Sequence, residues 1–237
     1  MDLLSKIALA FEHGGFWMWP ILAIQLASIA IVIERTYTLF FRHKMNQHEV
    51  VAAFEDNVRR GELDAVIQKA QAQEAVNPVA RAVVAGARAA QFLGGKEEIQ
   101  GKMDEVLIAE NASLDQRTGF LSMLGNVATL TGLLGTITGM IKSFAAVSYA
   151  NPSDKAALLA AGISEAMNAT AYGLITAIPA LVAYAILQNR ANRLAEDLNH
   201  SALKAFNWLS YTYEPVGFKS FKGALNPSEK VPAEFNS

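Results

Sequence analysis

The amino-acid sequence predicts an all-α integral membrane protein with three transmembrane helices and long helical extensions into the cytoplasm. Three apolar runs, at residues 16–33, 118–141 and 166–189, contain no charged residue. Each has at least 18 residues, which is enough for a helix to cross a bilayer. A polar segment with helical periodicity separates the first run from the second. The mean hydropathy of +0.21 fits a chain that lies partly in the membrane and partly in water.

The N-terminal segment, residues 1–15, is expected to be an amphipathic helix at the periplasmic membrane surface. Leu3, Leu4, Ile7 and Phe11 fall on one helical side. The acidic residues at positions 2 and 12 leave too short an apolar core for a cleaved signal peptide.

The first transmembrane helix is predicted at residues 16–41. Trp17 and Trp19 begin it, as expected of indole rings at a membrane interface, and Pro20 falls in its first turn, where a missing amide donor costs little. Glu34 and Arg35 end the charge-free run. They either pair with neighbouring helices or mark the polar boundary, and the boundary interpretation is favoured here.

Residues 42–117 are predicted to form a cytoplasmic helical domain. Helices are expected at 49–61, 63–73 and 79–92, where apolar residues recur at helical spacing between breakers at Gly61, Asn77-Pro78 and Gly94-Gly95. From about residue 97 to 144 no proline interrupts the pattern, so one long helix is expected to enter the membrane.

The second and third transmembrane helices are predicted at residues 118–144 and 166–189. A short periplasmic connection, residues 145–165, joins them, with Ser153 as the expected helix N-cap. Pro179 should kink the third span. A cytoplasmic helix at 190–214 and a flexible cytoplasmic tail at 215–237 complete the chain.

The distribution of Lys and Arg predicts the orientation. Ten of these residues lie in 42–117 and six after 189, against two in 142–165 and one before residue 16. The positive-inside rule therefore places the N-terminus in the periplasm and the C-terminus in the cytoplasm.

Small residues line one face of the second and third spans. Such faces allow helix backbones to approach closely in a membrane, so they predict helix packing and an oligomer. In the second span, Gly125, Thr129, Gly132, Thr136, Gly139 and Ser143 recur at steps of three and four. The candidate packing residues are Gly132, Gly135, Gly139, Ala169, Gly173 and Ala177.

Polar groups on the same spans are candidates for an ion path. Thr136, Thr170 and Glu165 are the main ones, with Asn168, Tyr172 and Thr129 as further contributors. A hydroxyl group both donates and accepts, so it relays a proton or contributes an oxygen ligand to a cation. The alternative for the threonines is a hydrogen bond to a carbonyl of their own helix, and for the carboxylate a place in the headgroup region.

No Asp, Glu, Lys or Arg lies inside the three charge-free runs. A proton path needs an ionisable group near mid-depth, so a partner helix carrying Asp or Glu is expected. The chain has no Cys, and its four His show no metal-site spacing. No metal, cofactor, enzyme activity or nucleic-acid binding is expected.

The motifs of the second and third spans resemble a known family. LTGLLGTITGMIKSF (residues 130–144) and GISEAMNATAYGLITAIPALVAY (residues 162–184) are similar to the two signature segments of the MotA/TolQ/ExbB proton channel family, and most similar to its ExbB/TolQ branch. The Glu34-Arg35 pair and the three-span layout agree, so the resemblance covers nearly the whole chain. Residues 42–95 and the tail match only in character, and Asn168 and Tyr172 stand where the family often has apolar residues.

The resemblance implies a bacterial inner-membrane motor subunit that forms a ring, typically a homopentamer. The ring would surround two helices of an ExbD/TolR-like single-span partner, which supplies the missing membrane Asp. Proton flow would then drive work on the cell envelope, with a TonB/TolA-like protein as a further partner beside membrane lipid. Carried over by motif, Thr136 and Thr170 would line the path, and Glu165 would be the family's acidic residue before the third span.

Two alternatives remain open at this point. Extra hydroxyls in these helices keep a sodium-driven stator of the same family possible; they belong to Thr129, Thr131, Thr138 and Thr176. In a non-conducting membrane scaffold, the glycine face would only pack helices and residues 42–117 would dock a cytoplasmic protein. The process that the protein energises is not specified by the sequence.

Overall fold

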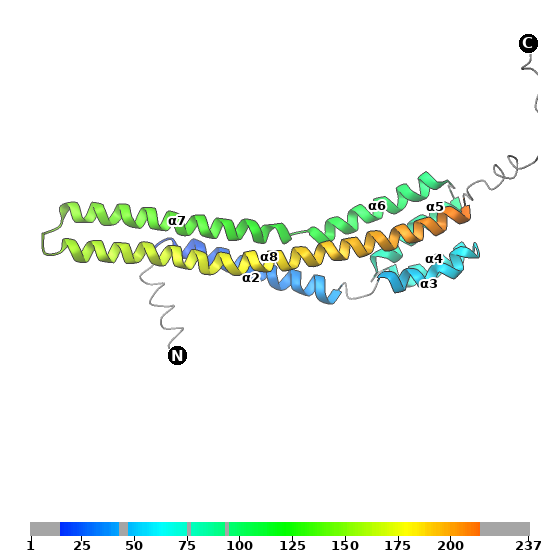
Figure 1. Ribbon diagram of the computed structural model, residues 1–237, viewed down its shortest axis with the longest axis horizontal. Helices are drawn as coiled ribbons and strands as arrows, with labels where there is room; N and C mark the ends of the chain where they lie inside the picture. Colours follow the sequence, from blue (N-terminus) through cyan, green and yellow to red (C-terminus); the bar gives the residue numbers. More distant parts are fainter. Residues whose placement is uncertain (1–14, 43–46, 75–76, 93–94, 214–237) are drawn as a thin grey trace, which may run out of the picture. The chain divides into compact units, whose positions relative to one another are not determined.

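The computed structural model describes residues 15–42, 47–74, 77–92 and 95–213 (Figure 1). The expected N-terminal amphipathic helix and the tail after residue 214 lie outside these ranges. Every regular element in the described ranges is helical, which agrees with the predicted all-α class. The described residues within 1–44 and 111–195 form one compact unit, and those within 45–110 and 196–237 form another.

Three helices are long and apolar enough to cross a membrane, as predicted. The first is α2, Met18–Tyr37, which continues as a π-helical turn at Thr38–Arg42. The second includes α7, Thr118–Tyr149, and the third belongs to α8, Lys155–Tyr213. Within the first unit, α7 and α8 lie side by side as an antiparallel pair (Figure 1).

The non-helical link between α7 and α8 is shorter than the connection predicted from the ends of the charge-free runs. Residues 150–154 are the non-helical part, so most of the predicted connection at 145–165 is helical. Because α8 begins at Lys155, Asp154 rather than Ser153 holds the cap position, and the expected cap is wrong by one residue. The Ser153 hydroxyl donates instead to Asp154 Oδ1 at 3.1 Å. Further along, α8 runs through Pro179 to Tyr213 as one helix.

The second unit contains three short helices together with parts of α6 (Lys96–Asp115) and α8. The short helices are α3, Gln47–Arg59, α4, Leu63–Glu74, and α5, Pro78–Phe92, which confirm the helices expected at 49–61, 63–73 and 79–92. Asn77 Oδ1 accepts a hydrogen bond from the Val79 amide at 3.0 Å, so Asn77 caps the start of α5. The largest fully buried side chains of this unit include those of Phe54, Val51, Val58, Val66, Ile99, Met103, Leu198 and Leu209.

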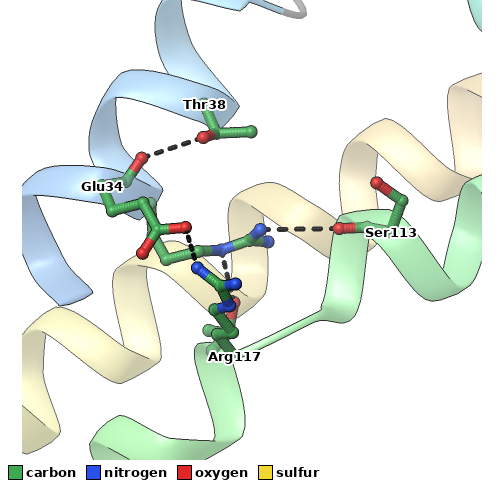
Figure 2. Close-up of polar contacts among 6 residues, drawn as sticks. Glu34, Thr38, Ser113 and Arg117 are labelled. Carbon is green, nitrogen blue, oxygen red and sulfur yellow. Dashed lines mark hydrogen bonds and ion pairs between the residues drawn. The ribbon is translucent and has the colours of Figure 1, made fainter.

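The expected continuous helix from 97 to 144 is wrong. The helix stops at Asp115 and restarts at Thr118, and Arg117 between them has a φ of +63°. The Arg35 guanidinium of α2 donates to the carbonyl oxygens of Ser113 and Leu114 at the end of α6. Glu34 pairs with Arg117 (Figure 2). The structure therefore supports the alternative that Glu34 and Arg35 pair with neighbouring helices. A tertiary contact interrupts a segment that has no proline at the break.

Candidate functional site

The backbones of α7 and α8 approach each other most closely at glycine. A Cβ atom placed on Gly173 would lie 2.8 Å from the carbonyl oxygen of Ala128 and 3.1 Å from the Cα of Gly132. A Cβ atom placed on Gly132 would lie 3.1 Å from the carbonyl oxygen of Ala169. Real Cβ atoms essentially never lie within 3.0 Å of another atom, so a side chain at Gly173 would force a backbone to move, whereas one at Gly132 would need a shift of a few tenths of an ångström.

The other candidate packing residues lie along the same helix pair. A Cβ atom placed on Gly135 would lie 2.6 Å from the Cβ of Ala169. On Gly139 it would lie 2.9 Å from the Cβ of Ala166. Ala177 is buried, and its carbonyl oxygen lies near Gly125. These contacts form a seam of small residues, which we call the glycine seam and define by Gly125, Gly132, Gly135, Gly139, Ala166, Ala169, Gly173 and Ala177.

The two main threonine candidates lie at the edge of the glycine seam. The Thr170 hydroxyl donates to the carbonyl oxygen of Gly132 at 2.9 Å and so joins α8 to α7. The Thr136 hydroxyl donates to the carbonyl oxygen of Leu133 in its own helix at 2.6 Å. Through this bond Thr170 lies level with Gly132, which precedes Thr136 by about one turn of α7. The two threonines are therefore separated by only about 6 Å along the α7 axis. Each hydroxyl oxygen keeps lone pairs that are able to accept a further hydrogen bond.

Thr136 faces away from α2. Trp17, at the start of α2, donates from its indole Nε1 to Thr138 Oγ1 at 2.6 Å, so Thr138 marks the α2 side of α7. Two residues span about 200° on a helix of 3.6 residues per turn. Thr136 therefore lies on nearly the opposite side of α7 from this contact.

Thr170 faces away from α2 by the same argument. The Tyr172 hydroxyl is hydrogen-bonded to Gln25 Oε1 of α2, so Tyr172 marks the α2 side of α8. Thr170 is again two residues away, about 200° around the helix. Thr136 and Thr170 are both half-buried in the isolated chain. Together they line the side of the α7–α8 pair that α2 does not cover, and we call this side the threonine face.

Glu165 does not lie with these threonines. Its carboxylate reaches toward Gly15, before α2, and Oε1 is 3.9 Å from Nζ of Lys142 on α7. Five residues, or about 140° around α8, separate Glu165 from Thr170. A cavity of about 420 Å³ opens here; its lining includes Gly15, Lys142, Ser143, Leu158 and Glu165.

The remaining candidates have different surroundings. Thr129 donates to the carbonyl oxygen of Gly125 at 3.1 Å within its own helix. Asn168 is half-buried. Tyr172 ties α8 to α2 through Gln25, which sequence reasoning did not single out. The available signal was a side-chain amide within the first charge-free run, because such a group in a membrane requires a polar partner.

Chemically, the threonine face offers hydroxyl groups and no ionisable group. The charge-free runs that surround it contain no Asp, Glu, Lys or Arg. The face is therefore able to orient water or a cation through hydroxyl oxygens, and the charge-free runs supply no carboxylate that could bind and release a proton there.

The chain is similar to known proteins of the ExbB and TolQ groups. A stretch of 91 residues is 36% identical to the biopolymer transport protein ExbB of Pseudomonas putida and covers 38% of this chain and 27% of that protein. A stretch of 102 residues is 39% identical to the Tol-Pal system protein TolQ of Haemophilus influenzae and covers 42% of this chain and 44% of that protein. The chain thus spans less than half the length of these two relatives. An ExbB-like biopolymer transport protein of Synechocystis is 29% identical over 187 residues, 75% of this chain and 68% of that protein.

The family profile covers a larger part of the chain. The MotA/TolQ/ExbB proton channel family matches residues 71–200, which include the glycine seam, the threonine face and Glu165. This range is more than half of the 237 residues. The chain therefore belongs to the MotA/TolQ/ExbB proton channel family, in its ExbB/TolQ branch.

Proposed function

We propose that the protein is the proton-conducting subunit of an ExbB/TolQ-like energy-transducing complex in the bacterial inner membrane. The observation that carries this proposal is the threonine face: Thr136 and Thr170 lie about one helical turn apart, on the side of the α7–α8 pair opposite to the α2 contacts. Both hydroxyl groups keep a lone pair on a face without charged residues, so they are able to accept hydrogen bonds from water in a polar path.

In this proposal, several copies of the chain form a ring with their threonine faces toward the centre. An ExbD/TolR-like single-span partner inserts its helix there and supplies the carboxylate that the charge-free runs lack. The proton would bind the partner's carboxylate, and Thr136 and Thr170 would orient water beside it. Movement of the partner helix would pass the resulting work to the envelope.

Co-purification tests the assembly. We expect the chain to purify in a stable complex with an Asp-bearing single-span protein and to contain several copies of itself, as counted by native mass spectrometry. Recovery of this chain only as a monomer, with no single-span protein attached, would overturn the ring. Attachment of a cytoplasmic protein in place of a single-span membrane protein would favour the scaffold alternative.

We propose that Glu165 takes part in the ion path at the cavity lined by Gly15 and Lys142. The positive-inside rule predicts that this cavity lies at the outer end of the path. We expect Glu165→Gln to lower proton-coupled work at least fivefold while thermal unfolding in detergent changes little. The Lys142–Glu165 pair contributes little to stability because its 3.9 Å separation is long and its side chains are 64% and 35% exposed.

Glu105→Gln is the matched control, because Glu105 also forms an exposed pair with a lysine, Lys102, at 3.0 Å. It should leave both coupled work and unfolding as in the parent protein. Equal coupled work in the Glu165 and Glu105 variants would remove Glu165 from the proposed path.

A further inference from the structure

A strained joint separates α6 from α7. Arg117 has a left-handed backbone, with a φ of +63°, and is the only non-glycine residue with positive φ in the described ranges. An L-residue with a long side chain adopts this conformation only when its surroundings impose it. Contacts around the joint must therefore hold Arg117 in this conformation.

Arg35 of α2 binds the polar groups that the joint exposes. A helix end leaves carbonyl oxygens without intrahelical partners. The Arg35 guanidinium donates to the carbonyl oxygens of Ser113 (3.5 Å) and Leu114, and its Nε donates to Thr118 Oγ1 at 3.1 Å. Arg35 is only 4% exposed. One buried side chain thus holds the last turn of α6 and the first residue of α7.

Two further contacts complete this arrangement. Glu34, next to Arg35, pairs with Arg117 itself (Figure 2). Asp115 accepts a hydrogen bond from Gln188 Nε2 of α8 at 2.8 Å. All three membrane helices therefore meet at the start of α7. We call this group the α7 anchor and define it by Glu34, Arg35, Asp115, Arg117, Thr118 and Gln188.

We propose that Arg35 is a positioning residue for the ion path: it fixes the rotation and axial position of α7, and through them the direction in which Thr136 points. This inference rests on the proposed function. Because α7 is a continuous helix, its first residue sets the orientation of Thr136, 18 residues and about 27 Å further along. A helix rotation of one residue, about 100°, would turn Thr136 off the threonine face.

Spin labelling tests the positioning directly, since the chain has no native cysteine. Single cysteines are introduced in turn at exposed positions of α7 outside the glycine seam, spin-labelled, and measured for oxygen accessibility in lipid; these positions are Val127, Leu130, Leu133, Leu134, Ile137 and Ile141. The parent protein should show a period of 3.6 residues. We expect Arg35→Ala to shift the phase of this period by at least a quarter of a turn. Arg35→Lys should keep the phase close to that of the parent protein.

Two further variants keep the test valid if Arg35→Ala fails to fold. Thr118→Val removes one acceptor of Arg35 and should shift the phase in the same direction by a smaller amount. Arg117→Gly relieves the backbone strain of the joint but removes the Glu34–Arg117 pair of the α7 anchor, so it should shift the phase less than Arg35→Ala does. Arg193→Ala removes an exposed arginine of α8 outside the α7 anchor and serves as the control. An unchanged phase in both Arg35→Ala and Thr118→Val would overturn the inference.

Proton flux in the complex with the single-span partner separates this inference from the proposed function. We expect flux to fall at least fivefold in Arg35→Ala and to recover in Arg35→Lys. A shifted phase with parental flux would overturn the link between Arg35 and the path while leaving the proposed function intact. Absence of flux in the parent complex would refute the proposed function, although the phase measurement on Arg35 would still stand.

Discussion

Replacing Thr136 and Thr170 together by valine is expected to lower proton-coupled work more than tenfold while the complex still assembles. Valine has nearly the shape of threonine but carries no hydroxyl, so water beside the partner's carboxylate loses both oxygens on the threonine face. Loss of the 2.9 Å bond from Thr170 to Gly132 should cost only about 1 kcal/mol of stability, which is too little to unfold the protein. The measurement compares energy-dependent envelope function with the amount of complex recovered.

The matched control is the double variant Thr136→Ser with Thr170→Ser, which keeps both hydroxyls and loses two methyl groups. It should retain most of the coupled work. Full activity in the valine variant would remove these hydroxyls from the path, and loss of activity in both double variants would point to packing instead of hydroxyl chemistry.

Gly173→Ala is expected to destabilise the protein because the added methyl group meets backbone atoms of α7. The new Cβ would lie 2.8 Å from the carbonyl oxygen of Ala128, and the α7 backbone must move to accommodate it. Overpacking of this kind costs about 1–3 kcal/mol. We expect a lower melting temperature in detergent and loss of the assembled complex, measured by thermal denaturation and size-exclusion chromatography.

Gly119→Ala provides the control on α7, because a Cβ placed there meets nothing within 4 Å. Alanine is the better helix former, so this variant should be as stable as the parent or slightly more stable. If Gly173→Ala and Gly119→Ala melt at the same temperature, the close approach of α7 and α8 at the glycine seam is incorrect.

The three membrane helices were predictable because a bilayer demands long charge-free runs, and the short helices α3, α4 and α5 because Gly61 and Asn77-Pro78 interrupt the apolar periodicity. The glycine spacing likewise indicated which faces of the second and third spans come together. These features depend on residues that are neighbours along one helix.

The features that were missed depend on residues far apart in the sequence. The break at Arg117 has no proline beside it, and its main support, Arg35, is 79 positions from Leu114. A helical wheel drawn from the sequence would have shown that Glu165 and Thr170 lie on different sides of α8. That Glu165 lies near Gly15, however, required the position of α2. Pairing between helices, as with Tyr172 and Gln25, has no local pattern to predict it.

The most direct test of the account is proton flux into lipid vesicles, followed with an internal pH-sensitive dye under an imposed membrane potential. Because the charge-free runs contain no carboxylate, we predict that the chain alone conducts no more than empty vesicles. Vesicles that also contain the single-span partner should conduct, and Asp→Asn in the partner's membrane helix should abolish the flux. Equal proton flux through the chain alone and through the complex would contradict the claim that a partner's carboxylate completes the path.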